Sequence, residues 1–109
     1  MPSARRNRYY EVALKLCNSS NHIKHKMAAV VVRGGAVLSK ATNKSAWGAH
    51  AEKRALQNLN CAKGAIIFIA RNRNRMSRPC TECLNLIKAL GIKKIIYSDW
   101  DGNLITEKI

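Results

Sequence analysis

The fold is constrained most strongly by residues 27 to 40, which read Met27-Ala28-Ala29-Val30-Val31-Val32-Arg33-Gly34-Gly35-Ala36-Val37-Leu38-Ser39-Lys40. The first half, Met27 to Arg33, holds a run of β-branched valines, which favours a buried strand. Gly34-Gly35 is typical of a tight hairpin turn, because glycine readily adopts the positive φ angles that such a turn requires. The second half, Ala36 to Lys40, is therefore predicted to return as an antiparallel strand.

Helices are predicted on both sides of this hairpin. Residues 4–17 have the apolar period of an amphipathic helix, with a stripe formed by Tyr9, Val12, Ala13, Leu16 and Cys17. Residues 49–60 contain no Gly or Pro and carry apolar side chains at helical spacing. A third helix is predicted to begin near Cys80, directly after Pro79, and to end at Gly91.

Further strands are predicted between and after these helices. Residues 65–70 are apolar throughout, as in a strand covered on both faces, and residues 94–98 form a fourth strand. A turn at 99–102 leads to residues 103–109, which form either a fifth strand or a tail. The order of elements predicts an α/β fold in one domain, residues 1–109. We expect a three-layer α/β/α sandwich around a mixed sheet of four to five strands, with an antiparallel hairpin at its start.

The composition excludes several classes of protein. A chain of 109 residues with 47% hydrophobic content can bury one core but is short for two domains. No apolar run is long enough to span a membrane, and no apolar segment follows the basic residues at the amino terminus. We therefore expect a cytoplasmic protein with no membrane partner, whose cysteines are reduced rather than paired in disulfides.

The net charge is the strongest signal in the composition. The chain has 20 Lys and Arg against 6 Asp and Glu, a formal charge of +14, with no acidic residue between Glu11 and Glu52. An excess of this size repels itself, and an anionic partner would relieve the repulsion. The charge therefore favours a nucleotide or nucleic-acid partner, although a basic chain that is merely well solvated is the alternative.

Two short motifs carry the candidate chemistry. His50-Ala51-Glu52 is followed, after 26 residues, by Pro79-Cys80-Thr81-Glu82-Cys83. H-x-E followed by P-C-x-x-C is the signature of zinc-dependent deaminases. His50, Cys80 and Cys83 supply three ligands to a tetrahedral Zn²⁺ and leave its fourth position to water, as in a catalytic site. Both motifs fall at predicted helix starts, where the helix dipole favours thiolate charge. Glu52 is the candidate proton shuttle.

Other interpretations of the cysteines remain open. C-x-x-C is also half of a zinc ribbon, but no second C-x-x-C follows. Cys17 lies at the end of the first predicted helix and Cys61 directly follows the second. At such helical positions, a buried apolar thiol is the ordinary interpretation. A redox pair at Cys80 and Cys83 would leave His50 and Glu52 unexplained.

Beyond these motifs, residues 23–98 resemble the cytidine and deoxycytidylate deaminase superfamily. The hairpin, Thr42-Asn43 and residues 91–98 are similar to corresponding segments of those enzymes. The resemblance implies a cytidine deaminase-like fold, a hydrolase of nucleotide metabolism, and zinc bound by His50, Cys80 and Cys83. It also implies that Glu52 moves protons, that Asn43 hydrogen-bonds the substrate sugar, and that Ala51 presents its backbone near the base. A homo-oligomer is left open.

An arginine-rich loop, residues 71–78, departs from many of those enzymes, which have almost no loop here. Arg75 and Arg78 are candidates for holding substrate phosphates, and a solvated disordered loop is the alternative. Trp47, before the zinc histidine, and Tyr97 are candidates for stacking on a base, although either aromatic residue also suits the core.

The sequence leaves three functions in competition. The first is hydrolytic deamination of cytosine to uracil, in a cytidine or deoxycytidine nucleotide or in single-stranded DNA or RNA. The second is an adenosine deaminase acting on transfer RNA, which carries nearly the same motif. The third is a basic zinc-containing nucleic-acid binding module without catalysis, which would need a closed site of four ligands, whereas the sequence offers three.

Overall fold

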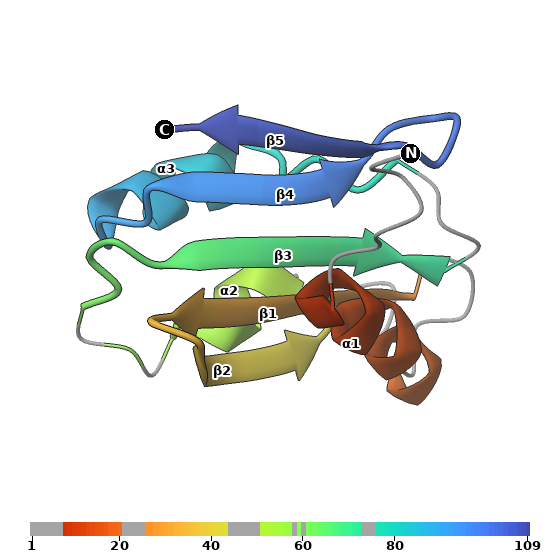
Figure 1. The fold of residues 1–109 in the computed structure, drawn as a ribbon, viewed down its shortest axis with the longest axis horizontal. Helices are drawn as coiled ribbons and strands as arrows, with labels where there is room; N and C mark the ends of the chain where they lie inside the picture. The colour runs from red at the N-terminus through yellow and green to blue at the C-terminus, as the bar shows by residue number, and fades with distance from the viewer. Residues whose placement is uncertain (1–7, 21–25, 44–50, 58, 60, 73–75) are drawn as a thin grey trace.

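The structure is a computed structural model that describes residues 8–20, 26–43, 51–57, 59, 61–72 and 76–109. A five-stranded sheet with the order β2-β1-β3-β4-β5 runs through the molecule (Figure 1). The helical elements in chain order are α1 (Arg8–Leu16), the 3₁₀ turn η2 (Cys17–Ser19), α2 (Ala51–Leu56) and α3 (Thr81–Ala89). The strands are β1 (Met27–Arg33), β2 (Ala36–Thr42), β3 (Ile66–Arg71), β4 (Lys94–Ser98) and β5 (Leu104–Lys108).

The predicted hairpin is confirmed. β1 and β2 pair antiparallel, and the turn residues Gly34 and Gly35 have φ angles of 59° and 80°, a region in which a side chain is strained. β1 is buried between two neighbours, because it also pairs antiparallel with β3, where Val30 lies opposite Phe68. β2 is an edge strand and continues to Thr42, two residues past the predicted end.

The other half of the sheet contains its parallel pair. β3 and β4 run parallel, joined by α3, and Ile67 lies opposite Ile95. β5 returns antiparallel to β4, so residues 104–108 are a strand and not a tail. The intervening turn is held by the Asp99 carboxylate, whose Oδ1 accepts hydrogen bonds from the backbone N–H groups of Asp101 and Asn103, both at 2.9 Å.

Helices cover both faces of the sheet, which confirms the three-layer prediction. Figure 1 shows α1 in front of the sheet and α2 and α3 behind it. The front layer packs α1 on residues of β1, β3 and β4, among them Val30, Phe68 and Ile96. The rear layer packs α2 and α3 on alternate residues of the same strands, among them Ile67 and Ile95. No helix among the described ranges is long and apolar enough to cross a membrane.

The predicted stripe of α1 is partly wrong. Val12 is 40% exposed, whereas Tyr10, absent from the predicted stripe, is 2% exposed. The buried line is Tyr10, Ala13 and Cys17, one step around the helix from the predicted line. Tyr9 instead lies at the border of the contact, and its hydroxyl donates to the Gly35 carbonyl at 2.9 Å, which the sequence period could not reveal.

The second helix is shorter than predicted. α2 ends at Leu56, and the segment after it bonds to another part of the chain: Ala62 N–H donates to Leu90 O at 3.0 Å and Gly64 N–H donates to Gly91 O at 2.9 Å. Cys61 consequently lies outside the helix and is exposed, so the prediction of a buried helical thiol is wrong there. It is correct for Cys17, where burial raises the pKa of the thiol to about 12.

We expect Gly91→Ala to destabilise the fold more than Gly64→Ala. Both glycines have positive φ, 83° and 77°, so each substitution carries the backbone strain of about 1 kcal/mol. A Cβ at position 91 would also lie 3.0 Å from the Cα of Lys63, whereas a Cβ at position 64 would meet no atom within 4 Å. Urea unfolding of both variants measures the difference, and equal losses would contradict the crowding at Gly91.

Candidate active site

The two cysteines of the C-x-x-C motif meet at the start of α3. Cys80 is the N-cap residue, with φ −70° and ψ 167°, and Cys83 lies one turn further along. Cys80 is exposed and Cys83 is 3% exposed. The spacing of three places both side chains on one side of the first turn, and the two thiols form a hydrogen bond. The helix start therefore presents a pair of sulfur donors, as the motif predicts.

Glu52 lies beside this pair. α2 and α3 are in contact, and on their surface Lys53 Nζ lies 3.3 Å from Glu82 Oε1. Glu52, in the first turn of α2, is 1% exposed, and its carboxylate is close enough to act electrostatically on Cys83. The preceding Ala51 is fully buried. The fold thus brings the Glu52 carboxylate close to two thiols that lie 28 and 31 residues further along the sequence.

The electrostatics of this cluster favour a bound cation. Burial, followed by the charge of Glu52 and the neighbouring Cys80, raises the pKa of the Cys83 thiol. The helix dipole at the start of α3 acts in the opposite direction and favours the thiolate. A divalent cation would reverse the balance, because it stabilises each of these anions. Two sulfur donors beside a buried carboxylate therefore fit Zn²⁺.

The third predicted ligand lies outside the described residues. His50 precedes the first described residue of α2, and Trp47 and Arg75 also fall outside the described ranges. Within those ranges, no group of three His, Cys, Asp or Glu side chains is arranged to hold a metal ion. Of the three predicted ligands, the described cluster contains Cys80 and Cys83, and their role as ligands stays a prediction.

Asn43 is held firmly at the end of β2. It is 8% exposed, and its side-chain Oδ1 accepts hydrogen bonds from the Ser20 hydroxyl at 2.6 Å and from the Met27 N–H at 2.9 Å. The Ser20 hydroxyl also lies 2.9 Å from the Asn43 carbonyl. These contacts fix the plane of the Asn43 amide. Its predicted contact with a substrate sugar stays a prediction.

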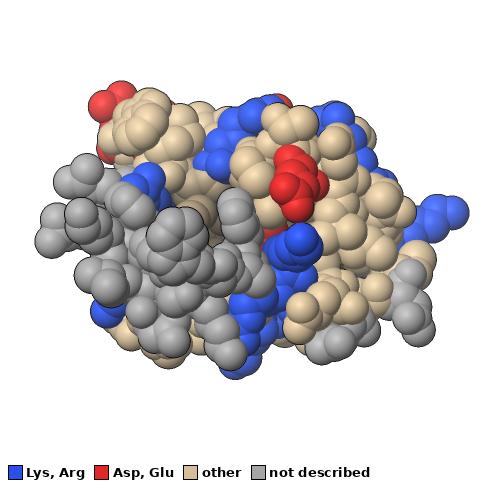
Figure 2. Space-filling model, turned by 180° about the vertical axis from the view of Figure 1, so that it is seen from behind, with Lys and Arg blue, Asp and Glu red and all other residues tan. Residues whose placement is uncertain are grey.

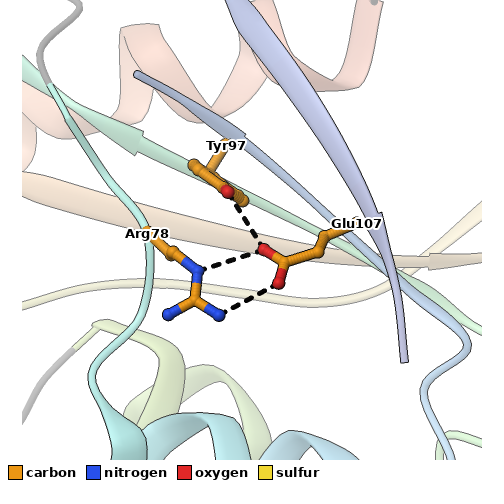
Figure 3. A network of polar contacts seen from close by, with 3 residues as sticks. All are labelled: Arg78, Tyr97 and Glu107. Carbon is orange, nitrogen blue, oxygen red and sulfur yellow. Dashed lines mark hydrogen bonds and ion pairs between the residues drawn. The ribbon is translucent and has the colours of Figure 1, made fainter. Parts of the chain in front are cut away.

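Arg78 and Tyr97 meet on a residue that the sequence did not single out. Figure 3 shows both side chains directed at the carboxylate of Glu107. Arg78 Nε and Nη2 donate to the two carboxylate oxygens at 3.1 and 3.0 Å, and the Tyr97 hydroxyl donates to Oε2 at 2.9 Å. Arg78 lowers the pKa of Glu107, with a smaller contribution from Tyr97, and Glu107 raises the pKa of Arg78. Burial, then Glu107, raises the pKa of Tyr97.

The position of Glu107 follows from strand pairing. Tyr97 lies opposite Ile105 and Ile95 lies opposite Glu107, so Tyr97 and Glu107 are diagonal neighbours on one face of the sheet. The sequence around Glu107 did not indicate its contact with Tyr97, because residues 103–109 were predicted as either a strand or a tail. The available hint was its charge, because Glu107 is one of only 6 acidic residues in a strongly basic chain. Tyr97 is 7% exposed, which leaves little of its ring for stacking on a base.

Comparison with known proteins identifies the family. The family described as the cytidine and deoxycytidylate deaminase zinc-binding region matches residues 3–99 of the chain. The chain belongs to this family. It is therefore a deaminase, and the matched residues include both motifs, 50–52 and 79–83. No curated protein is matched by the sequence.

Solved structures of deaminases share the fold. The deoxycytidylate (dCMP) deaminase of the cyanophage S-TIM5 is 24% identical, with a TM-score of 0.72 over 94% of this chain and 89% of its own. The cytidine deaminase of Burkholderia pseudomallei is 17% identical, with a TM-score of 0.73 over 94% of this chain and 92% of its own. A Thermotoga maritima diaminohydroxyphosphoribosylaminopyrimidine deaminase and reductase is 21% identical, with a TM-score of 0.63 over 78% of this chain and 26% of its own. At these identities, the likeness concerns the fold.

On one face of the molecule, the described basic side chains are dispersed (Figure 2). Figure 2 shows the face opposite to that of Figure 1, on which Lys and Arg side chains form several separate groups and acidic side chains are few. The pair of Lys53 and Glu82 joins α2 and α3. Over the described part of this face, the charge is therefore better suited to general attraction of anions than to a continuous track for a polymer.

We expect Glu107→Gln to remove an acid-sensitive part of the stability. Because the folded pKa of Glu107 is lowered, its contribution to stability is present above the ordinary glutamate pKa of about 4.3 and is lost as the pH falls through the folded pKa. The stability difference between wild type and Glu107→Gln should therefore shrink between about pH 6 and about pH 3. Urea unfolding at a series of pH values measures this.

The ion pair supplies its own control. Arg78→Gln removes the main partner of Glu107, so this variant should lose the same pH-dependent component, and the double variant should lose little more. A wild-type pH profile in Glu107→Gln would contradict the assignment.

Proposed function

We propose that the protein is a zinc-dependent hydrolytic deaminase that converts cytosine to uracil, with a cytidine or deoxycytidine nucleotide as substrate. His50, Cys80 and Cys83 would hold the zinc, and Glu52 would carry protons. The observation that carries the proposal is the position of Glu52: a carboxylate 1% exposed lies beside the paired thiols of Cys80 and Cys83. Burial of a carboxylate is costly, and a cation beside it would offset that cost.

Zinc in this site would supply a Lewis acid that makes a water molecule nucleophilic near neutral pH. Glu52 then carries the protons of the hydrolysis. Its carboxylate takes one proton from the attacking water and delivers it to the ring nitrogen beside the reacting carbon. It then takes the remaining proton from the hydroxyl that has added to this carbon and gives it to the amino group, which leaves as ammonia while the carbonyl forms. A buried position suits this role, because bulk water does not compete for the protons in transit.

Several observations support a nucleotide as the substrate. A cyanophage S-TIM5 dCMP deaminase with the same fold, 22% identical over 87% of this chain and 81% of its own with a TM-score of 0.69, is known in complex with dCMP and dUMP. The net charge of +14 favours a phosphate-bearing substrate over a neutral nucleoside. Arg75 and Arg78 are the proposed phosphate contacts, and Arg78 stands directly before the Pro79-Cys80 step.

The rest of the proposed pocket would recognise the nucleoside. Asn43 would bind the sugar, with its amide plane held by Ser20 and Met27. The backbone of Ala51, at the start of α2, would face the base, and Trp47 would form the rim of the pocket. A base in a single strand could occupy the same pocket, which makes single-stranded DNA and RNA necessary comparisons.

We expect Glu52→Gln to lower kcat by roughly 10²–10⁴-fold on dCMP or CMP while the protein keeps its zinc. The amide has nearly the shape of the carboxylate but does not accept and return protons. Ammonia release and the change in absorbance from cytosine to uracil measure the rate, and elemental analysis measures the zinc.

The matched control is Glu82→Gln. Glu82 lies on α3 between the two cysteines, but its side chain is 79% exposed and, among the described residues, forms its ion pair with Lys53 at the surface. This variant should keep its rate to within about two-fold, because an exposed pair contributes little. Full activity in Glu52→Gln would overturn the assigned role of Glu52.

Substrate choice is tested on one panel: dCMP, CMP, cytidine, adenosine-containing transfer RNA, and single-stranded DNA and RNA. The proposal requires uracil from a mononucleotide. Product only from a strand, with a rate that falls steeply as salt is added, would point to a polynucleotide deaminase. Inosine would point to the adenosine deaminase. Bound zinc with no product from any substrate would point to the binding module.

A further inference from the structure

Ser77 lies three residues before Cys80 and belongs to no predicted site. It is 1% exposed and makes a closed set of hydrogen bonds with the carboxyl ends of β3 and β4. Its hydroxyl donates to Ile69 O at 2.7 Å and accepts from Ser98 N–H at 2.9 Å. Its own N–H donates to Ser98 O at 2.9 Å, and the two serine hydroxyls lie 3.1 Å apart.

These bonds hold the loop on the parallel pair of strands. Ile69 lies in β3 and Ser98 ends β4, and the two strands run side by side with Ile69 opposite Tyr97. Ser98 is fully buried, so water does not substitute for any of these bonds. The Ser77 hydroxyl therefore links both strands to one point of the loop.

The chain between Ser77 and Cys80 is stiff, so the position of Ser77 determines the position of Cys80. Arg78 precedes a proline, which disfavours the helical backbone for it, and the ring of Pro79 fixes its own φ angle. Cys80 follows with extended backbone angles as the N-cap of α3. Few rotations remain over these three residues, so a displacement of Ser77 becomes a displacement of the Cys80 sulfur.

An outer contact acts on the same loop. Arg78 is tied to Glu107 of β5 by the pair of hydrogen bonds at 3.1 and 3.0 Å, but both side chains are well exposed, at 43% and 38%. An exposed ion pair is screened by water and salt, whereas the buried serine bonds are not. The inner contact at Ser77 is therefore the one that sets the loop position.

We propose that Ser77 is a positioning residue for metal binding, which holds Cys80 at the distance and angle that the cation requires. The proposal rests on the proposed function, because it takes the cation to be zinc bound by Cys80 and Cys83. Ser77 acts through the backbone of the loop. The hydrogen-bond partners of its hydroxyl are Ile69 and Ser98, and not the cysteine sulfur atoms. Ser98 is its partner in this role.

The test compares zinc affinity with stability in Ser77→Ala, Ser98→Ala and Ser39→Ala. Ser39 is the matched control: its hydroxyl donates to the Ala55 carbonyl of α2, so its loss also removes a partly buried hydrogen bond, but outside the cysteine loop. Zinc affinity is measured by competition with a chelator, and unfolding is followed with and without zinc.

We expect Ser77→Ala to bind zinc on the order of 10-fold more weakly, as is typical when the support of a metal ligand is removed. Ser98→Ala should show a smaller loss, because Ser77 then keeps its bonds to Ile69 O and to the backbone of residue 98. Ser39→Ala should unfold more easily and keep its zinc affinity. The rise in stability caused by zinc should be reduced only in the two loop variants.

The outcomes separate this inference from the function on which it rests. If the wild-type protein binds no zinc, the proposed function fails. If wild type binds zinc and Cys83→Ala does not, but both loop variants bind zinc as tightly as Ser39→Ala does, the positioning role of Ser77 is overturned. If Ser77→Ala does not fold, the zinc affinity of Ser98→Ala is the test. A wild-type zinc affinity in Ser98→Ala would then overturn the positioning role of Ser77.

Discussion

The parallel pairing of β3 with β4 is the constraint on which the candidate site depends. Ile67 lies opposite Ile95, so the carboxyl ends of the two strands meet at one edge of the sheet. A parallel connection needs a crossover, and α3 supplies it. The loop that enters α3 must leave the end of β3 at this edge, where the backbone of β4 is within reach of Ser77. The pairing thus fixes where the helix bearing the cysteines begins.

The ionisable groups at that edge oppose one another's ionisation. A buried carboxylate beside two thiols raises the pKa of Cys83, so the fold has assembled groups that resist ionising together. Under the proposed function, a bound cation would relieve this opposition, because each unfavourable contact between the anions would then become an attraction to the cation. The same burial that raises the pKa would strengthen the bonds to a metal.

Local pattern was sufficient to predict much of the fold. Residues 27–40 were predicted as a hairpin because β-branched residues and a Gly-Gly turn act over short distances, and the observed hairpin has the same turn. The end of α2 was mispredicted because it is set by hydrogen bonds from Ala62 and Gly64 to a segment almost 30 residues away. The burial of Tyr10 was not predicted, because Tyr9 and Tyr10 are neighbours on the helix and either fits the apolar period. Such outcomes depend on tertiary contacts.

The candidate site divides in the same way. Glu52, Cys80 and Cys83 were predictable because they belong to two short motifs with a recognisable spacing. The structure brings these three residues together. Glu107 and Ser77 were not, because their importance comes from register and loop placement rather than from residue type. A glutamate on a late strand and a serine in a basic loop resemble many surface residues in sequence. Only the pairing of β4 with β5 and the position of the loop assign them partners.

Glu107 also changes how Arg78 could meet a substrate. Its carboxylate takes two of the guanidinium donors, and the Tyr97 hydroxyl stabilises that carboxylate, so the trio carries no net charge. A phosphate at Arg78 must either share the guanidinium or displace Glu107, and displacement also breaks the bond from Tyr97. Under the proposed function, long-range attraction of a nucleotide would therefore come from the remaining basic side chains, whereas a contact at Arg78 would be a short-range one that discriminates between anions. The chain has a net charge of +14, which attracts anions of every kind. Because Glu107 neutralises Arg78, the site would bind fewer of these anions non-specifically.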